Sequence, residues 1–416
     1  MHAIKPNHLV CLLTLSITGS ANADFFKDNH ASLQMRNFYF DRDFANGPGQ
    51  SQAQEWAQGF ILRMNSGFTE GPVGFALDAQ GMAGFKLDSG PGRSGTGLLP
   101  FDPASGEPDN EYSELGLTAK ARYSASELHI DILQPLLPVI LAVPSRLFPP
   151  TFRGAYLRSQ EIENLTLHAG HIDRINLRNS TNTEGMRISS PNRRFNGAAE
   201  SNAFNFVGAD YRFNERLTGS YYHAQLDDLY QQHYLGVVHY LPLGEGKLKT
   251  DLRYFDSRED GAAKAGNVDN RTYNAMFTYQ RQGHSLGLGY MQLTGATALP
   301  YLAGTDVNVN TEGALTSEFV NPNERVWQVR YDYDFAALGV PGLRAMWRYI
   351  KGDQIELPGA SRSAKERERG LELSYVVQSG SLRGLGLRVR QAANRNDFSR
   401  DIDETRVNID YTLALW

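Results

Sequence analysis

The stretch RVNIDYTL at residues 406–413 decides the fold, because polar and apolar side chains alternate along it without a break. Successive side chains of an extended strand point to opposite faces of a sheet, so the odd positions would meet an apolar environment and the even positions water. The same period of two recurs at residues 115–122, 248–254, 327–333, 344–349 and 385–390. An all-β fold is therefore predicted.

The composition excludes a helical membrane protein. The mean hydropathy is −0.43, and beyond the N-terminus no stretch approaches the roughly 20 apolar residues that a membrane helix needs. A closed β-barrel is the membrane architecture that remains, since its strands show half of their side chains to lipid and half to water. A net charge of −5 gives no indication of nucleic-acid binding.

The N-terminus predicts export. Lys5 precedes an apolar run at residues 9–17, and Ala21-Asn22-Ala23 forms an A-x-A cleavage signal. Residues 1–23 are therefore predicted to be a secretory signal peptide and residues 24–416 the mature barrel. The only cysteine, Cys11, lies in the signal, so a mature chain would hold no disulfide and no cysteine metal site.

About eighteen strands are expected, an even number as a single-chain bacterial barrel requires. The segments near 154, 203 and 230 alternate weakly, so sixteen strands is the alternative. Short turns would face the periplasm, and the long connections would be extracellular or fold into the lumen: 83–110, 135–153, 173–202, 257–270, 294–323 and 352–366. The predicted strands begin near residues 31, 52, 71, 111, 126, 154, 164, 203, 216, 230, 247, 271, 284, 324, 342, 367, 383 and 404.

A soluble β-sandwich also alternates and is the competing interpretation. Three features count against it. The apolar positions are rich in aromatic residues, as in the girdles of outer-membrane barrels, while the opposite face carries Arg and Lys at mid-strand. The chain also ends on a strand with an aromatic residue, Trp416, although Trp416 falls on the polar parity of that strand.

Four motifs resemble the OprD-type porins, the outer membrane carboxylate channels: EWAQGF at 55–60, SGFTEGPVGF at 66–75, LDSG at 87–90 and GTGLLP at 95–100. The segment SRLFPPTFRG at 145–154 is similar to their third loop, and the ending from 387 to 413 is similar as well. The resemblance implies an 18-stranded barrel in the outer membrane of a Gram-negative cell, with an inward-folded third extracellular loop. It also implies passive uptake of small carboxylates along basic side chains, by a monomer or a weak homotrimer.

Residue parity independently predicts a basic strip on the lumen wall. Adjacent strands lie about 4.8 Å apart and i, i+2 positions about 6.7 Å, so arginines on the last strands would form one surface. Guanidinium groups could pass a carboxylate along it through paired hydrogen bonds. Closure of the ring would bring the last strand beside Gln34 and Arg36 of the first. The strip comprises Arg344, Arg348, Arg388, Arg390 and Arg406.

Other charged residues are weaker candidates. Arg146 and Arg153 are expected near the third-loop constriction, and Asp306, Glu312 and Glu318 could form a vestibule that attracts cations. Each of these residues could instead be solvated or paired with a neighbouring charge. The charge run at 365–369 is predicted to be a solvated strand rim. The secondary lumen candidates are Lys120, Arg122, Lys249, Arg253 and Arg330.

Catalytic and cofactor motifs are absent from the sequence. GPGRSG at 90–95 matches a dinucleotide-binding pattern, but no βαβ unit surrounds it. His168 and His171 would lie on opposite faces of a strand, so no metal site is predicted. No enzyme activity and no cofactor are therefore expected. A selective carboxylate channel is favoured, a general diffusion porin is the alternative, and an outer-membrane hydrolase would need a catalytic grouping that is not found.

Overall fold

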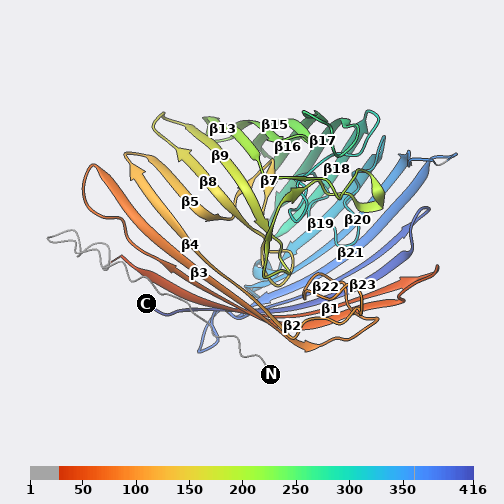
Figure 1. Cartoon of the computed structure of the whole chain (residues 1–416), viewed down its shortest axis with the longest axis horizontal. Coiled ribbons are helices and arrows are strands. Elements are labelled where there is room, and N and C mark those ends of the chain that lie inside the picture. The colour runs from red at the N-terminus through yellow and green to blue at the C-terminus, as the bar shows by residue number, and fades with distance from the viewer. Residues whose placement is uncertain (1–27, 360) are drawn as a thin grey trace, which may run out of the picture.

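The computed structural model describes residues 28–359 and 361–416, and in them eighteen long antiparallel strands close into a barrel (Figure 1). No helix of the described residues is long and apolar enough to span a bilayer. The first nine strands are β1 (His30–Ala45), β2 (Gln52–Asn65), β3 (Val73–Asp88), β4 (Glu111–Tyr123), β5 (Ser126–Leu133), β8 (Thr151–Ser159), β9 (Leu165–Asn176), β13 (Phe204–Asn214) and β14 (Leu217–Leu226). The second nine are β15 (Tyr230–Leu243), β16 (Gly246–Glu259), β17 (Asp269–Arg281), β18 (His284–Thr294), β19 (Arg325–Asp334), β20 (Leu343–Ile355), β21 (Ala364–Val376), β22 (Gly386–Asn396) and β23 (Asp401–Ala414).

Short strands and 3-10 turns lie within the connections between the long strands. β6 (Leu136–Leu137) pairs with β7 (Ile140–Leu141), β11 (Met186–Arg187) pairs with β12 (Glu200–Ser201), and β10 (Thr183–Glu184) pairs antiparallel with the end of β9. Two 3-10 turns, η1 (Pro191–Arg193) and η2 (Phe335–Leu338), complete the order. Gln282 and Gly283 join β17 to β18 with φ of 48° and 85°. Two positive φ values suit the tight hairpin turns that match strand twist.

The barrel closes between its first and last strands. Each long strand pairs with the next along the chain, and β23 pairs with β1 over fourteen residue pairs. Arg36 lies opposite Asp410, and Phe40 lies opposite Arg406. The expected closure is thus confirmed, but the expected neighbours of Arg406 are wrong, because Gln34 and Arg36 lie nearer the periplasmic end of the seam.

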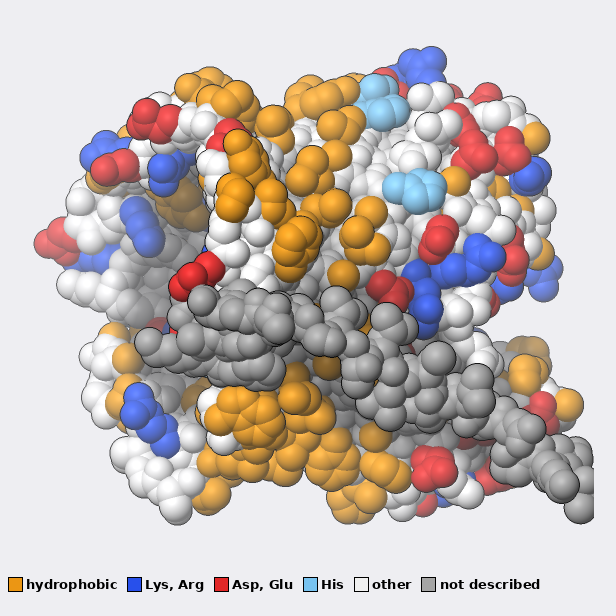
Figure 2. All heavy atoms as spheres, turned by 60° about the vertical axis from the view of Figure 1, so that its left-hand side comes forward, with side chains coloured by type: hydrophobic (Ala, Val, Ile, Leu, Met, Phe, Trp, Pro, Cys, Tyr) orange, Lys and Arg blue, Asp and Glu red, His pale blue; other side chains and the backbone are white. Residues whose placement is uncertain are grey.

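Alternation sorts the side chains between lipid and lumen. On β21, Glu366 and Glu368 are buried inside the barrel, while Leu371 and Leu373 are 43% and 51% exposed. Figure 2 shows hydrophobic side chains gathered across the middle of one face, with most of its charged side chains toward the two ends. An apolar band between charged rims is what a barrel needs to sit in a bilayer.

Hydrophobic packing fills the lumen beside β8–β16. Aromatic side chains of the wall, such as Phe206 and Tyr222, form one cluster with Ile140, Leu302 and other residues of the long connections. Lumen-facing glycines make room for the rings: a Cβ on Gly208 would lie 2.0 Å from the Tyr222 ring. This packing leaves open space mainly along the remaining strands, where the charged cavities lie.

The predicted architecture is confirmed in most respects. Eighteen strands exclude the alternative of sixteen, and the weakly alternating segments are real strands, β8, β13 and β15. Predicted and observed strand starts agree within three residues. The predicted signal peptide lies outside the described residues. β23 ends at Ala414, so Trp416 lies beyond the alternating strand; its carbonyl still accepts a hydrogen bond of 3.2 Å from the Ala31 amide.

Candidate functional site

Two adjoining cavities run through the open part of the lumen. The loop-side cavity, about 570 Å³, lies between the 295–324 loop and the arginines of β1, β22 and β23. The turn-side cavity, about 720 Å³, is lined by β16–β22. Glu312 lines both cavities, so together they form one candidate path for a solute.

Three guanidinium groups surround one phenylalanine ring in the loop-side cavity. The Cζ atoms of Arg406, Arg42 and Arg146 lie 4.4, 5.2 and 5.2 Å from the centroid of the buried Phe40 ring. These distances suit cation–π attraction, which offsets part of the repulsion among the three charges. Arg42, Arg146 and Arg406 are hereafter the arginine trio.

The trio is held by further contacts. Glu404 lies 2.6 Å from Arg42 and 2.5 Å from Arg406, so one buried carboxylate serves two arginines. Arg406 also donates to the Leu315 carbonyl at 2.7 Å. Burial lowers the pKa of the Arg146 guanidinium, and repulsion from Arg406 and Arg178 lowers it further. An arginine still remains charged at neutral pH, so the trio and Glu404 together keep an excess of positive charge.

Arg390 is the least engaged arginine of this cavity. Its Nη2 donates to Asn408 Oδ1 at 3.1 Å, while its buried Nε has no hydrogen-bond partner. No carboxylate of the described residues lies within 4.0 Å of its guanidinium. Its Nη1, which is neither buried nor hydrogen-bonded to the described residues, is therefore free to donate to an incoming anion.

Acidic residues of the 295–324 loop line the same cavity. Asp306 lies 3.8 Å from Arg178, and Glu318 lies 3.2 Å from Arg194. Burial raises the pKa of Asp306, although Arg178 and Arg146 oppose this effect; burial also raises the pKa of Glu312, against Arg253. The loop-side cavity thus carries opposed charges, as expected of a vestibule for cations or zwitterions.

Arg348 does not belong to an open strip, contrary to expectation. It is buried below the 295–324 loop and lines neither cavity. Its Nη atoms donate to the carbonyls of Glu312 and Gly313 at 3.1 and 2.6 Å, and Glu368 lies 3.8 Å away. Both Nη groups are directed at the loop carbonyls, and the side chain is buried and lines neither cavity, so Arg348 positions the loop.

Glu368 fixes the same loop from β21. Its carboxylate accepts hydrogen bonds from the amides of Leu315 and Thr316, both at 2.9 Å. Its neighbour on the lumen face, Glu366, accepts from Ser317 Oγ and from Asn321 Nδ2. The acidic members of the 365–369 run are therefore loop anchors, which differs from the expected solvated rim.

The other predicted strip residues line the turn-side cavity, where each has an acidic partner. Arg388 lies 3.3 Å from Glu372, and Arg344 lies 3.1 Å from Asp334 at the turn end. The predicted strip is thus divided: Arg390 and Arg406 line one cavity, and Arg344 and Arg388 the other.

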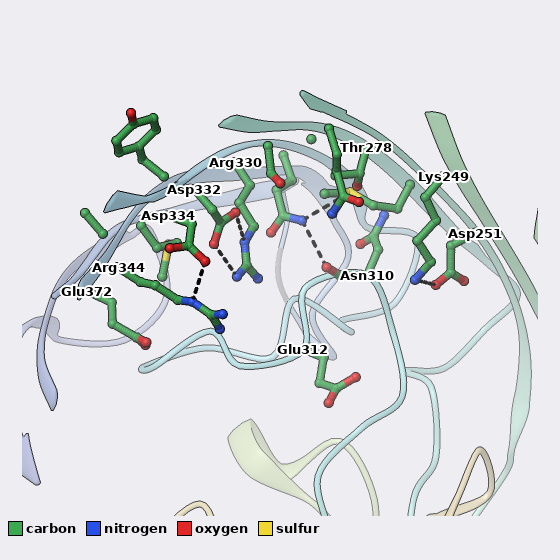
Figure 3. Close-up of a pocket in the computed structure, with 18 of the residues that line it drawn as sticks. Lys249, Asp251, Thr278, Asn310, Glu312, Arg330, Asp332, Asp334, Arg344 and Glu372 are labelled. Atoms are coloured by element: carbon green, nitrogen blue, oxygen red, sulfur yellow. Dashed lines mark hydrogen bonds and ion pairs between the residues drawn. The ribbon is translucent and has the colours of Figure 1, made fainter. Parts of the chain in front are cut away.

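Three of the secondary lumen candidates share the turn-side cavity (Figure 3). Lys249 and Arg253 both bind Asp251, at 3.0 and 2.9 Å, whereas Arg330 forms two hydrogen bonds to Asp332. Figure 3 shows Arg330 and Arg344 turned toward their acidic partners along one wall. These bases are present at the site but largely compensated.

Other candidates lie apart from both cavities. Lys120 binds Asp78 at 2.8 Å, and Arg122 stacks over Phe68 near the periplasmic turn. Arg153 lies on β8 rather than in the third connection, is about half exposed, and has Asp131 at 3.8 Å. Arg146 alone of the two predicted constriction arginines reaches the loop-side cavity.

The third connection contacts lumen-facing side chains of β1 and β2. Leu147 and Phe148 belong to a buried cluster with Phe38, Phe40 and Ile61. A Cβ on Gly59 would lie 2.9 Å from Leu147, so this glycine permits the close approach.

Sequence reasoning missed Arg42, Arg178 and the role of Phe40. Arg42 shares the parity of Phe38 and Phe40, so alternation in 30–45 contained a usable signal. Arg178 lies in the irregular segment after β9, where no periodic pattern marks an inward side chain.

A family model for "outer membrane porin, OprD family" matches residues 23–415. The chain belongs to the OprD family. This membership places it in the outer membrane as a channel for small solutes. The porin-like protein GalP of Pseudomonas putida is 37% identical over 94% of this chain and 93% of its own.

Solved porins of this family share the barrel. OccK9 (OpdG) of Pseudomonas aeruginosa is 40% identical with a TM-score of 0.90, over 94% of this chain and all of its own. OpdK of the same organism, in a crystal structure with vanillate, is 39% identical with a TM-score of 0.88 over the same shares. An OprD-family barrel and the two charged cavities together define the candidate transport path.

Proposed function

We propose that this OprD-family channel passes small carboxylates by passive diffusion, with no covalent step. The observation that carries the proposal is the free Nη1 donor of Arg390 next to the arginine trio, in the cavity that Ser145 and Arg146 also line. A negatively charged solute is attracted there, while distributed and partly compensated bases let it leave again.

The proposed order of contacts follows the lumen wall. A carboxylate entering between the loops first meets the arginine trio and Arg390. Arg388 lies two residues along the same face of β22, about 6.7 Å away, and leads into the turn-side cavity. Planar guanidinium groups can accept a carboxylate through two parallel hydrogen bonds, which orients it at each step.

We also infer that residues 144–148 narrow the path, as the resemblance implies for the third loop. Their contacts with Phe38, Phe40 and Gly59 support this, and so does the hydrogen bond of 2.9 Å from Arg146 to the Thr96 carbonyl. The acidic residues opposite the trio would suit the ammonium group of an amino acid. The crystal structure of the relative OpdK with vanillate supports aromatic acids as a second substrate class.

A general diffusion porin is the second candidate, because opposed acidic and basic groups at a neck are typical of such channels. Asp306, Glu312 and Glu318 face the same cavity as Arg390 and the trio. The two functions differ in selectivity: a general porin shows little preference among solutes of equal size.

A liposome-swelling panel of amino acids, aromatic acids and neutral sugars separates them. We expect carboxylates to enter faster than sugars of similar size, and the variant Arg388→Gln/Arg390→Gln to lose most of that preference. Arg216→Gln/Arg281→Gln is a charge-matched control, since both arginines are exposed at the periplasmic turns and line neither cavity. Equal carboxylate uptake by the parent and the lumen variant would refute the arginine assignment.

A further inference from the structure

The basic members of the 365–369 run point away from the lumen. Glu366 and Glu368 are buried inside, so Arg367 and Arg369 project from the outer face of β21, where both are exposed. Farther toward the periplasm the outer face becomes apolar at Leu371. The two arginines therefore lie where the barrel leaves the apolar layer, at its extracellular rim.

A third base extends this surface across the sheet. Lys351 of β20 lies directly opposite Arg367, and Tyr349 lies opposite Arg369. Paired residues on adjacent strands place their side chains about 5 Å apart on one face. In the described part of the chain, no carboxylate lies within 4.0 Å of the charged group of Lys351, Arg367 or Arg369. These three residues are hereafter the basic rim patch.

Arginines on the two neighbouring strands form ion pairs, whereas the three residues of the basic rim patch do not. Arg395, opposite Arg367 on β22, contacts Asp403 at 2.9 Å and Asp401 at 3.6 Å. Arg325, opposite Asp353, binds that carboxylate at 3.0 Å. Three uncompensated cations on one small surface repel each other unless an anion joins them.

An apolar groove of about 380 Å³ lies on the same strands, below the patch. Leu371 and Leu373 follow Arg369 at steps of about 6.7 Å on the same face, so the groove begins one step inside the apolar layer. Its outer-facing lining is apolar except for Gln391: Tyr331, Ala345, Trp347, Leu371, Leu373 and Val389. Cations above a hydrocarbon-sized groove match a molecule that carries phosphate and acyl chains together.

We propose that the basic rim patch and this groove bind a phosphorylated, acylated glycolipid of the outer leaflet. Its phosphates receive charge-assisted hydrogen bonds from Arg367, Arg369 and Lys351, and one acyl chain lies in the groove. A free phosphate ion would use the patch alone, whereas the groove favours the membrane lipid as the source of the phosphate. The site lies outside the lumen and is independent of the proposed carboxylate path.

The test uses the full-length protein in nanodiscs, titrated with bis-phosphorylated lipid A and, separately, with dephosphorylated lipid A. We expect tight binding of the phosphorylated form only, and about 100-fold weaker binding by Lys351→Gln/Arg367→Gln/Arg369→Gln, since each of the three bases near an anionic headgroup contributes about fivefold. Arg216→Gln/Arg281→Gln/Arg383→Gln removes three exposed bases from the periplasmic turns and should bind like the parent. Binding by the rim variant within threefold of the parent would overturn the proposal.

A groove variant separates the lipid from a soluble anion. Val389→Phe should weaken binding of the phosphorylated lipid severalfold while leaving any competition by inorganic phosphate unchanged. Equal binding of phosphorylated and dephosphorylated lipid by the parent would refute the role of the patch, and unaltered lipid binding by Val389→Phe would refute the role of the groove. Heat-modified mobility on gels verifies that each variant is folded, and the rim variant should retain the parent's conductance because its residues face away from the lumen.

Discussion

Arg406 and Phe40 face each other across the seam that closes the barrel, with the guanidinium carbon 4.4 Å from the ring centroid. Glu404 and the Leu315 carbonyl accept further hydrogen bonds from Arg406. The same contact therefore helps to hold the two closing strands together and fixes the position of a positive charge in the candidate transport path. Because Arg406 is so fully engaged, the neighbouring Arg390 is the arginine best placed to exchange partners with a solute.

Arg390→Gln should lower carboxylate-dependent current more than Arg388→Gln. Arg388 is half exposed and already lies 3.3 Å from Glu372, whereas Arg390 has a free Nη1 donor in the smaller cavity. A lost charge-assisted hydrogen bond of about 1.5–3 kcal/mol predicts a roughly tenfold or larger loss of affinity for the carboxylate. Single-channel recordings at increasing benzoate concentrations measure this loss of affinity. A larger effect of Arg388→Gln would contradict this order.

Acidification should make the channel more anion-selective. Burial raises the pKa of Asp306 and of Glu312, so both carboxylates lose their charge at a higher pH than exposed ones do. As the pH is lowered from neutrality, negative charge leaves the loop-side cavity before it leaves exposed carboxylates, while every arginine stays charged. Reversal potentials in a salt gradient should shift toward the anion value, and Asp306→Asn/Glu312→Gln should abolish most of the shift. If the reversal potential of the parent protein stays constant as the pH is lowered, the prediction of greater anion selectivity is wrong.

Glu368→Gln should loosen the 295–324 loop without opening the barrel. The carboxylate holds two loop amides at 2.9 Å and lies beside the buried Arg348. Loss of a buried charge next to Arg348 should cost about 3 kcal/mol locally, whereas the strand ladder is unchanged. Limited proteolysis should cut the loop faster in this variant. Glu372→Gln, on the same face of β21 but paired with Arg388 and with no loop amide among the described residues, is the matched control and should be cut at the parental rate.

Gly208→Ala should destabilise the packed half of the lumen. The added methyl would lie 2.0 Å from the Tyr222 ring, which also donates a hydrogen bond of 2.5 Å to Asp210. Displacing the ring should cost about 1–3 kcal/mol, seen as a lower temperature for the loss of heat-modified mobility. Gly370→Ala, whose methyl would find only Arg348 at 4.0 Å, should be nearly neutral. Similar melting of both variants would count against the tight packing.

The strands could be predicted from sequence because lipid and water impose a period of two on every one of them. That rule located β8, β13 and β15 even where alternation was weak, and it gave the lumen parity of Arg388, Arg390 and Arg406. Parity alone does not tell whether an inward side chain reaches open space. Arg348 has the correct parity, yet the 295–324 loop covers it.

Contacts between segments that are distant in the sequence could not be predicted either, because the parity of a residue does not show which other residues it meets. Arg42 meets Glu404 only because β1 and β23 close the ring in one register, and the expected register was displaced by several residues. Arg178 depends on an irregular loop without periodicity. The alternating run at 365–369 contained both signs of charge, and only the direction of its strand shows that acids hold the loop while bases face outward.

The hydrophobic packing beside β8–β16 has a consequence for how the channel sorts molecules by size. Loop residues such as Ile140 and Leu302 are part of the same dry core as the wall, so they cannot swing aside one at a time without exposing apolar surface to water. The largest solute that the channel admits should therefore be the same at every membrane voltage. Among solutes below that size, the charges on the opposite wall would determine which ones pass.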